Sequence, residues 1–201
     1  MSERSDGCWA SRQATARAEV LAGSRRLLDL FPEHPGLRLA VGADLGSLLD
    51  GVAQQHAAGR SVAVLVSGDP GLFSLAAKLV RRFGREPCEI VPGVSSVQVA
   101  FARLGVDWVE ARILSAHARI PQVAVEELAR HDKIAILAGT PEALGWAAQL
   151  AGALRISHTA YLCENLTLED ERVQAVAPED LAAADASSLS IVLLIRRAEL
   201  S

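Results

Sequence analysis

Short apolar segments alternate with longer helical patterns along most of this 201-residue chain. Two of the short segments, residues 62–66 and 191–195, are apolar at every position rather than at every second position. Uninterrupted apolar strands are typical of a sheet that helices cover on both faces, and strands that alternate with helices favour a largely parallel sheet. The sequence therefore predicts an α/β fold.

The apolar and capping patterns predict the individual elements. The expected strands are Leu37–Val41, Val62–Val66, Glu89–Val91, Ala111–Ser115, Ile134–Ala138, Thr159–Leu162 and Ile191–Ile195, with an antiparallel pair formed by Tyr161–Leu166 and Arg172–Ala177. The expected helices run from Asp44 or Ser47 to Ala58, over Leu72–Phe83, over Val97–Leu104 after a cap at Ser95 or Ser96, and from Pro141 to about Leu150. Polar caps, a first-turn proline and terminal glycines support these helix ends.

The rhythm of strands and helices changes near Val106–Glu110, and this change predicts a domain boundary at about residue 109. Residues 1–109 are expected to form an N-terminal lobe with a mostly parallel sheet, and residues 110–201 a C-terminal lobe with a mixed sheet. No Gly/Ser-rich linker separates them, so we expect direct packing, with a ligand between the lobes at the carboxyl ends of the strands.

Composition narrows the function classes. Half of the residues are apolar and the formal net charge is −4, which argues against wholesale binding of nucleic acid or an anionic membrane. The N-terminus is polar and the longest apolar runs have strand length, so we expect a cytoplasmic protein without a membrane partner. Cys8, Cys88 and Cys163 form no CxxC pair and no cluster with zinc spacing, so no metal site is expected.

The sharpest local feature is Ser67-Gly68-Asp69-Pro70-Gly71, which directly follows an apolar strand and precedes a helical pattern. Glycine at the end of a strand lets a ligand approach the backbone, the next helix start offers free N–H groups, and Asp69 can accept hydrogen bonds. Asp-Pro-Gly is also good turn chemistry without any ligand. The segment lacks the lysine of a P-loop and the GxGxxG of a dinucleotide site.

Pro92-Gly93-Val94-Ser95-Ser96 repeats this logic after the next expected strand. An ordinary helix cap would need only one of the two serines. Two successive strands that both end in a glycine-containing turn beside a helix start predict one shared ligand crevice.

These two segments and several others resemble the tetrapyrrole methylase family, and within it the cobalt-precorrin-7 or precorrin-6Y carbon-5 methyltransferases. The matching segments, in chain order, are Gly23-Ser24-Arg25-Arg26-Leu27-Leu28, Ser67-Gly68-Asp69-Pro70, the stretch from Ile90 to Gly105, Ser115-Ala116-His117-Ala118-Arg119, Cys163-Glu164-Asn165-Leu166 with Glu169-Asp170-Glu171-Arg172, and Ser187-Ser188-Leu189-Ser190-Ile191-Val192. The resemblance covers almost the whole chain from about Asp6.

The resemblance implies a two-lobed tetrapyrrole methylase fold, usually dimeric, that uses S-adenosylmethionine to methylate carbon 5 of a precorrin in cobalamin biosynthesis. A precorrin with or without cobalt would fit. By the matching motifs, the cofactor-binding residues would be Ser67, Gly68, Asp69, Ser95, Ser96, Ala138 and Ser188.

Methyl transfer from a sulfonium needs alignment and exclusion of water rather than a protein nucleophile. His117 is the candidate base, or a contact to a substrate carboxylate, and a surface histidine is the alternative. The acetate and propionate groups of a precorrin call for arginine donors. The candidates are Arg25, Arg26, Arg119 and Arg172, each of which could instead be a solvated surface charge.

One departure from the family pattern concerns the start of the chain. The family opens with an apolar strand and a Gly-x-Gly loop, whereas Asp6-Gly7-Cys8-Trp9-Ala10 already resembles the segment after that loop. We expect a translation start set too far downstream; the alternative is a chain that lacks a central strand.

Other functions of the same fold are the competing hypotheses. They are a methyltransferase for a modified histidine or for ribosomal RNA, and a non-catalytic module that binds tetrapyrrole or cofactor. Decarboxylation, which related bifunctional enzymes perform, would need a separate partner enzyme.

Overall fold

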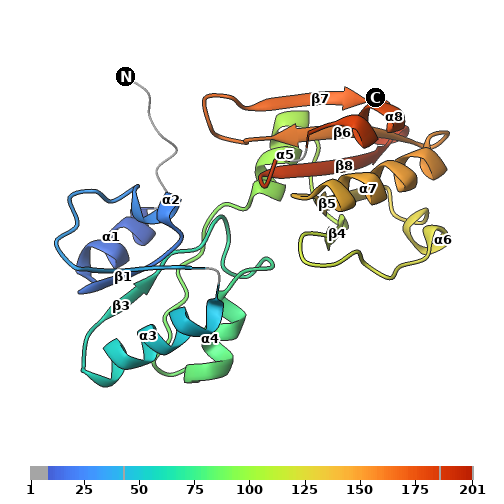
Figure 1. The fold of residues 1–201 in the computed structure, drawn as a ribbon. Coiled ribbons are helices and arrows are strands. Elements are labelled where there is room, and N and C mark those ends of the chain that lie inside the picture. Colours follow the sequence, from blue (N-terminus) through green and yellow to red (C-terminus); the bar gives the residue numbers. More distant parts are fainter. Residues whose placement is uncertain (1–8, 43, 186, 201) are drawn as a thin grey trace. The chain divides into compact units, whose positions relative to one another are not determined.

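The computed structural model describes residues 9–42, 44–185 and 187–200. The chain divides into two compact units between Ser95 and Ser96 (Figure 1). This division precedes the boundary predicted at about residue 109, because α5 (Ser96–Leu104) contacts β8 (Ser190–Arg196) and so belongs to the second unit.

The first unit is built around a small parallel sheet. In chain order it contains α1 (Trp9–Arg17), β1 (Val20–Gly23), α2 (Arg25–Leu28), β2 (Leu37–Ala40), α3 (Leu45–Ala57), β3 (Val62–Val64) and α4 (Ala76–Phe83). The three strands lie in the order β2–β1–β3, and both pairings are parallel. The predicted parallel sheet of the N-terminal part is therefore confirmed.

Helix α3 shows how the sequence sets both the start and the packing of an element. The Asp44 carboxylate accepts the backbone N–H groups of Gly46 and Ser47, each at 2.9 Å, and so caps the helix as predicted. Leu48 and Val52 lie one turn apart on α3 and are buried in one cluster with Ala22 of β1. The helix thus covers the centre of the small sheet.

The central strand, β1, was not predicted from the sequence. Its four residues are all buried, yet only three apolar residues precede Gly23, which is too short a run to indicate a strand by itself. Pairing on both sides supplies the hydrogen bonds that hold this segment extended. Burial and pairing, rather than local pattern, make it a strand.

Two predictions in the first unit were wrong. Glu89–Val91 is not a strand, because no strand of the described residues pairs with it to form a ladder. The helix expected from Leu72 begins at Ala76, because residues 71–75 form turns in which Phe73 has a positive φ of 48°.

The second unit contains a larger, mixed sheet. After α5 come β4 (Arg112–Ser115), α6 (Val125–Leu128), β5 (Lys133–Leu137), α7 (Pro141–Leu154), β6 (His158–Glu164), β7 (Arg172–Val176), α8 (Pro178–Ala183), β8 and the 3-10 helix η1 (Arg197–Leu200). The strand order is β4–β5–β8–β6–β7, in which only β4 and β5 are parallel. The predicted mixed sheet, its β6–β7 antiparallel pair and the α/β class are confirmed.

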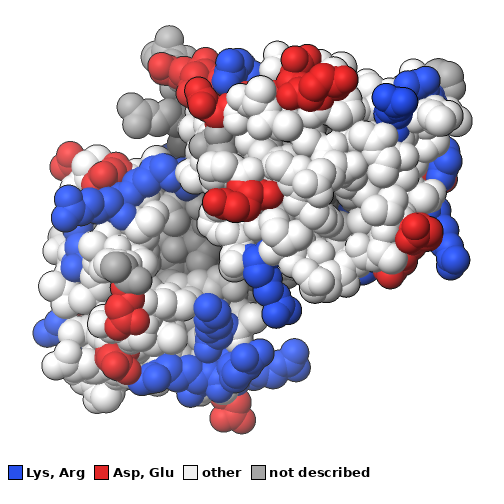
Figure 2. Space-filling view, turned by 45° about the vertical axis from the view of Figure 1, so that its right-hand side comes forward, with Lys and Arg blue, Asp and Glu red and all other residues white. Residues whose placement is uncertain are grey.

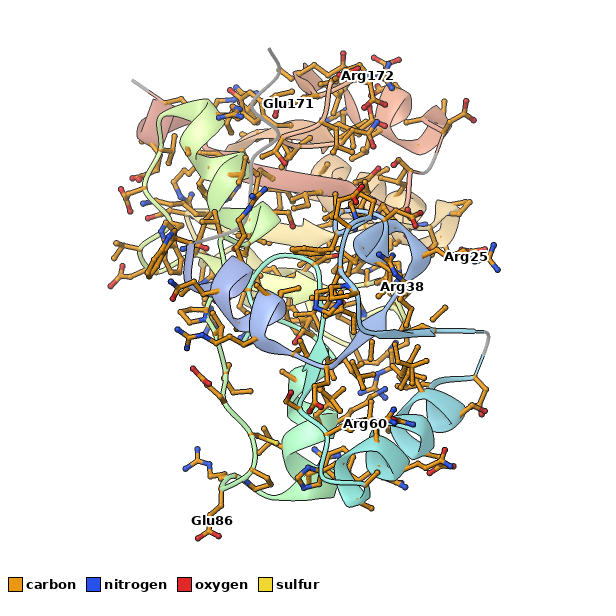
Figure 3. All side chains as sticks on the ribbon, turned by 90° about the vertical axis from the view of Figure 1, so that its left-hand side faces the viewer. Arg25, Arg38, Arg60, Glu86, Glu171 and Arg172 are labelled. Carbon is orange, nitrogen blue, oxygen red and sulfur yellow. The ribbon has the colours of Figure 1, made fainter. Side chains whose placement is uncertain are left out.

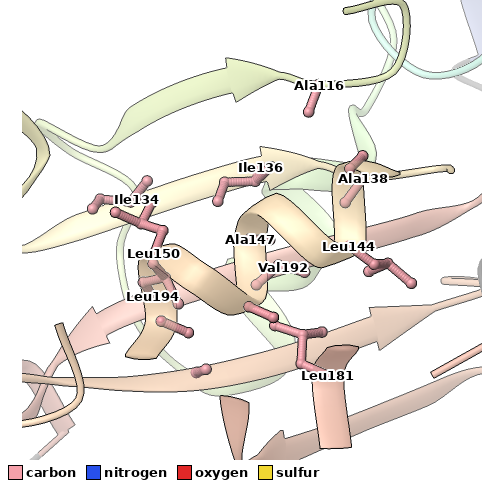
Figure 4. Packing of buried hydrophobic residues seen from close by; sticks show 14 of the residues in the cluster. Ala116, Ile134, Ile136, Ala138, Leu144, Ala147, Leu150, Leu181, Val192 and Leu194 are labelled. Carbon is pink, nitrogen blue, oxygen red and sulfur yellow. The ribbon is translucent and has the colours of Figure 1, made fainter. Parts of the chain in front are cut away.

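Helix α7 forms the core of the second unit with the strands beneath it (Figure 4). Thr140 caps the helix by accepting the N–H of Ala143 at 3.2 Å, and Pro141 occupies the first turn, as the sequence predicted. Leu144 and Ala147 of α7 are buried against the same cluster as Ile136 of β5. The other larger side chains of the cluster are Leu114, Leu128, Ile134, Leu150, Leu154, Leu162, Leu181, Val192 and Leu194.

The face of the molecule in Figure 2 carries Lys and Arg as well as Asp and Glu, with broad uncharged areas between them. This mixture agrees with the small negative net charge of the whole chain, −4. None of the helices formed by the described residues is both long and apolar enough to cross a membrane.

Candidate functional site

The two glycine-containing turns of the first unit lie against each other. A Cβ atom added to Gly93 would come within 2.5 Å of the carbonyl oxygen of Gly68. Only glycine permits this approach, and Gly68 itself has a positive φ of 68° that favours glycine. The predicted closeness of these turns is therefore confirmed, although the segment before Gly93 is not a strand.

Asp69 holds the two turns together. Its Oδ1 accepts the backbone N–H of Gly71 at 2.7 Å, and its Oδ2 accepts the N–H of Gly93 at 3.2 Å. Charge-assisted bonds from a carboxylate to backbone N–H groups are stronger than neutral ones. Asp69 thus fixes the backbone that a ligand would meet, in addition to any contact of its own.

Arg26 joins this region through Ser67. The Nη2 of Arg26 donates a hydrogen bond of 2.8 Å to the Ser67 Oγ, so a predicted substrate residue and a predicted cofactor residue lie in contact. Arg25 and Arg26 are both exposed, and the Arg25 side chain points away from α2 (Figure 3). Ser95 is buried, and Ser96 is the first residue of α5.

The second unit brings a further group of predicted residues together where β5 ends. A Cβ atom added to Gly139 would lie 2.7 Å from the Nδ1 of His117 and 2.9 Å from the carbonyl oxygen of Ser188. Ala138 is fully buried and donates its N–H to the carbonyl of Ser190 at 3.0 Å. His117, Ala138 and Ser188 therefore surround one short stretch of backbone, and Gly139 is the residue that the sequence analysis missed.

A row of side chains continues from Ala138 across the same end of the sheet. Glu164 of β6 is paired in register with Ser190 of β8 and with Arg172 of β7. The Glu164 carboxylate accepts the Arg172 Nη2 at 2.9 Å; the Glu164 side chain is 4% exposed and that of Arg172 is 66% exposed. Glu164 thus binds one edge of the Arg172 guanidinium, and the remaining N–H donors of Arg172 stay available to an anion.

Two further observations describe the chemistry of this end of the sheet. The buried Oγ of Ser190 has no hydrogen-bond partner within the described residues. Arg119, predicted as a substrate-binding arginine, is exposed. No group of His, Cys, Asp and Glu side chains in the described part of the chain could hold a metal ion.

The loop between β6 and β7 is fixed by charged and polar contacts that the sequence did not reveal. Glu171 accepts Nε and Nη2 of Arg103, the latter at 3.1 Å, and also the backbone N–H of Thr167. These hydrogen bonds, with the Arg103 bond as the largest cause, hold the pKa of Glu171 below its ordinary value. Asn165 accepts the Ser187 hydroxyl at 3.2 Å, which ties this loop to the segment that carries Ser188.

The arrangement offers backbone-lined glycine turns, short hydroxyl side chains and arginine donors. Gly68 is exposed and Gly93 is partly exposed, which suits a ligand that requires close approach to the main chain. The arginines suit carboxylates. Of the predicted residues, Ser67, Gly68, Asp69 and Arg26 come together in the first unit, and His117, Ala138 and Ser188 in the second.

Comparisons with known proteins agree with this description. Residues 10–182 match the model of the family described as Tetrapyrrole (Corrin/Porphyrin) Methylases. The chain is 34% identical to a cobalt-precorrin-7 C(5)-methyltransferase of Salmonella typhimurium over 191 residues, which are 94% of this chain and 92% of that protein.

Solved structures show the same fold. A cobalamin biosynthesis precorrin-6Y methylase from Archaeoglobus fulgidus aligns with a TM-score of 0.71 and 26% identity, over 96% of this chain and 93% of that chain. A uroporphyrin-III C-methyl transferase from Thermus thermophilus, solved in complex with S-adenyl homocysteine, aligns with a TM-score of 0.70 and 22% identity over 92% and 89% of the two chains. The family match, the relative and the shared fold lead to one conclusion: this chain belongs to the tetrapyrrole (corrin/porphyrin) methylase family.

Proposed function

We propose that this protein is an S-adenosylmethionine-dependent C-methyltransferase that methylates carbon 5 of a precorrin, cobalt-precorrin-7 or precorrin-6Y, in cobalamin biosynthesis. The observation that carries the proposal is the contact between Gly68 and Gly93, where any side chain on Gly93 would collide with the Gly68 carbonyl. The 34% identity to a cobalt-precorrin-7 C(5)-methyltransferase over nearly the whole chain supports the substrate class.

The residues present fit the cofactor. The residues that we propose to hold it are Ser67, Gly68, Asp69, Ser95, Ser96, Ala138 and Ser188. Backbone groups and hydroxyls of this kind suit the hydroxyl, amino and carboxylate groups of S-adenosylmethionine. When bound, this cofactor supplies an activated methyl group.

His117 and the arginines would act on the substrate. His117 touches the backbone at Gly139, and we propose it as the acceptor of the proton that the methylated carbon gives up. Arg26, Arg119 and Arg172, with Arg25, would bind the carboxylates of the precorrin. Because Glu164 holds one side of Arg172 at 2.9 Å, that guanidinium is oriented before a substrate arrives.

Methyl transfer tests the proposal directly. The purified protein is incubated with S-adenosylmethionine and with cobalt-loaded or cobalt-free precorrin, and the product is examined by mass spectrometry and by NMR of a labelled methyl carbon. The proposal expects a new methyl at carbon 5 of one of these substrates. A protein that binds cofactor but transfers no methyl to either substrate would contradict it.

Asp69→Ala tests the cofactor assignment. Loss of the carboxylate frees the N–H groups of Gly71 and Gly93, and we expect binding of S-adenosylhomocysteine to weaken by about 1–3 kcal/mol in calorimetry. Asp44→Ala is the matched control, because Asp44 also accepts two backbone N–H groups of the first unit. It should lower stability and leave the affinity unchanged; equal affinity in Asp69→Ala would remove Asp69 from the site.

Three finer properties complete the proposal. The family resemblance supports a homodimer and a separate enzyme for the decarboxylating step, and the composition supports a cytoplasmic location. Analytical ultracentrifugation of the purified protein tests the dimer, and a single monomeric species at micromolar concentration would contradict it.

A further inference from the structure

Phe73 combines an exposed ring with an uncommon backbone conformation. It is 58% exposed, whereas the other three phenylalanines, Phe31, Phe83 and Phe101, are partly or fully buried. Its φ is +48°, a left-handed conformation that is uncommon for a bulky residue. Both its exposure to water and its backbone conformation therefore act against stability.

The turn around Phe73 is held without its ring. The N–H of Leu72 donates to the carbonyl of Asp69 at 3.1 Å, the Ser74 hydroxyl donates to the carbonyl of Pro70, and the N–H of Ala76 donates to the Ser74 Oγ at 3.1 Å. All of these partners belong to the segment that follows Gly68. The backbone thus presents the ring to solvent from a loop that has its own hydrogen bonds.

Thr167 has the same kind of backbone conformation as Phe73, but a hydrogen bond explains it. Thr167 also has a positive φ, of 70°, but its backbone N–H is bound by the Glu171 carboxylate, which Arg103 holds in turn. A charged network therefore compensates the conformation of Thr167. Phe73 lies four residues after Asp69, whose carboxylate binds the N–H groups of Gly71 and Gly93.

We propose that the Phe73 ring is a stacking surface for a flat conjugated group of a ligand bound at residues 67–71. The inference rests on the proposed function, which provides two such groups: the adenine of the cofactor and the macrocycle of the precorrin. Aromatic side chains stack on rings of this kind through their faces. A residue that is unfavourable in the free protein and favourable in the complex fits a binding role.

Phe73→Gly separates this role from a structural one. Glycine relieves the positive φ and removes an exposed ring, so Tm should stay the same or rise. Loss of stacking should weaken either S-adenosylhomocysteine binding, measured by calorimetry, or the KM for precorrin at saturating cofactor, by about tenfold. A weaker binding of S-adenosylhomocysteine would identify adenine as the partner of Phe73, and a raised KM would identify the precorrin macrocycle. Phe73→Tyr keeps an aromatic ring and should restore the affected Kd or KM.

Glu110→Gly is the matched control, because Glu110 is exposed and has a positive φ of 58° outside the proposed site. It should relieve the same kind of strain and change neither binding measurement. A Phe73→Gly protein with lower Tm, or with unchanged Kd and KM, would overturn the inference while the proposed function stands. If the wild-type protein does not bind S-adenosylhomocysteine, the proposed function fails as well, and the two failures are distinguished.

Discussion

The two units bury their strands to very different degrees. In the first unit only β1 is buried throughout, while β2 is mostly exposed and β3 is partly exposed along its length. In the second unit β8 is buried at every position but its last, and β5 is buried at all but its last. Both units carry predicted site residues, but the strands that support these residues are less buried in the first unit than in the second.

This difference indicates where the molecule should open locally. Local unfolding is easiest where few apolar side chains are buried. Among the described residues, the buried cluster around α3 in the first unit contains Ala22, Leu48 and Val52, whereas the large cluster of the second unit extends over four strands and three helices. The glycine turns at Gly68 and Gly93 therefore lie on the less stable unit, and hydrogen bonds such as those of Asp69 become more important there.

The largest expected effect comes from a truncation in the deeper core. Leu194 of β8 is fully buried in the cluster beneath α7, so Leu194→Ala should lower the free energy of unfolding by about 2–5 kcal/mol. Val64→Ala in β3, which is only partly buried, should cost about 1 kcal/mol or less. Urea denaturation of both variants measures these two changes in the free energy of unfolding. Equal decreases would show that the two units do not differ in burial as described.

A smaller effect is expected from the ion pairs of the two units. Arg103 meets both oxygens of Glu171, which also accepts the Thr167 N–H, so Arg103→Ala should cost about 1 kcal/mol. Arg82 makes one bond of 2.6 Å to Asp50 on an exposed surface, and Arg82→Ala should cost about 0.3 kcal/mol. Thermal denaturation at low and high salt checks this order; a larger loss for Arg82→Ala would reverse it.

The smallest expected effect is a pH dependence of the second unit. Burial lowers the pKa of His158 and nearby Arg196 adds to this, while the hydrogen bond to the His131 carbonyl and the charge of Asp132 oppose it. The unfolded chain therefore binds this proton at a higher pH than the folded protein does. The contribution of the neutral His158 ring to the free energy of unfolding is complete above the pKa that His158 has in the unfolded chain. This contribution is lost as the pH falls below that value.

His158→Gln tests this sign. Between about pH 7 and pH 5, the free energy of unfolding of the wild-type protein should fall, and the variant should show a shallower slope because it lacks the titrating ring. The buried position next to Ser157 and the His131 carbonyl can accommodate an amide. An identical slope in both proteins would assign the pH dependence to other groups.

Strands and helices that carry a long local pattern could be predicted from the sequence, and those that depend on distant pairing could not. The caps at Asp44 and Thr140 predict the starts of α3 and α7, and the apolar run of β8 predicts that strand, each from neighbouring residues alone. Strand β1 is too short to be recognised and is held by β2 and β3. Glu89–Val91 has the composition of a strand but no partner strand among the described residues.

The same distinction applies to the candidate site. The glycine turns at residues 67–71 and 92–96 were visible because their residue types limit the backbone. They lie close together although Gly93 does not follow a strand. The sequence gives no sign that Arg103 meets Glu171, because they are far apart in the chain and each resembles a surface charge. The positive φ of Phe73 was hidden for a similar reason, since its apolar spacing fits the helix that begins only at Ala76.

The most direct test of the account is calorimetric titration of S-adenosylhomocysteine into wild-type, Gly93→Ala and Gly42→Ala proteins. A methyl group at position 93 would meet the Gly68 carbonyl at 2.5 Å and must push the turns apart, whereas no atom of the described residues lies within 4 Å of a Cβ at position 42. We expect tight binding by the wild-type and Gly42→Ala proteins and at least about tenfold weaker binding by Gly93→Ala. Equal affinity in all three proteins would contradict it.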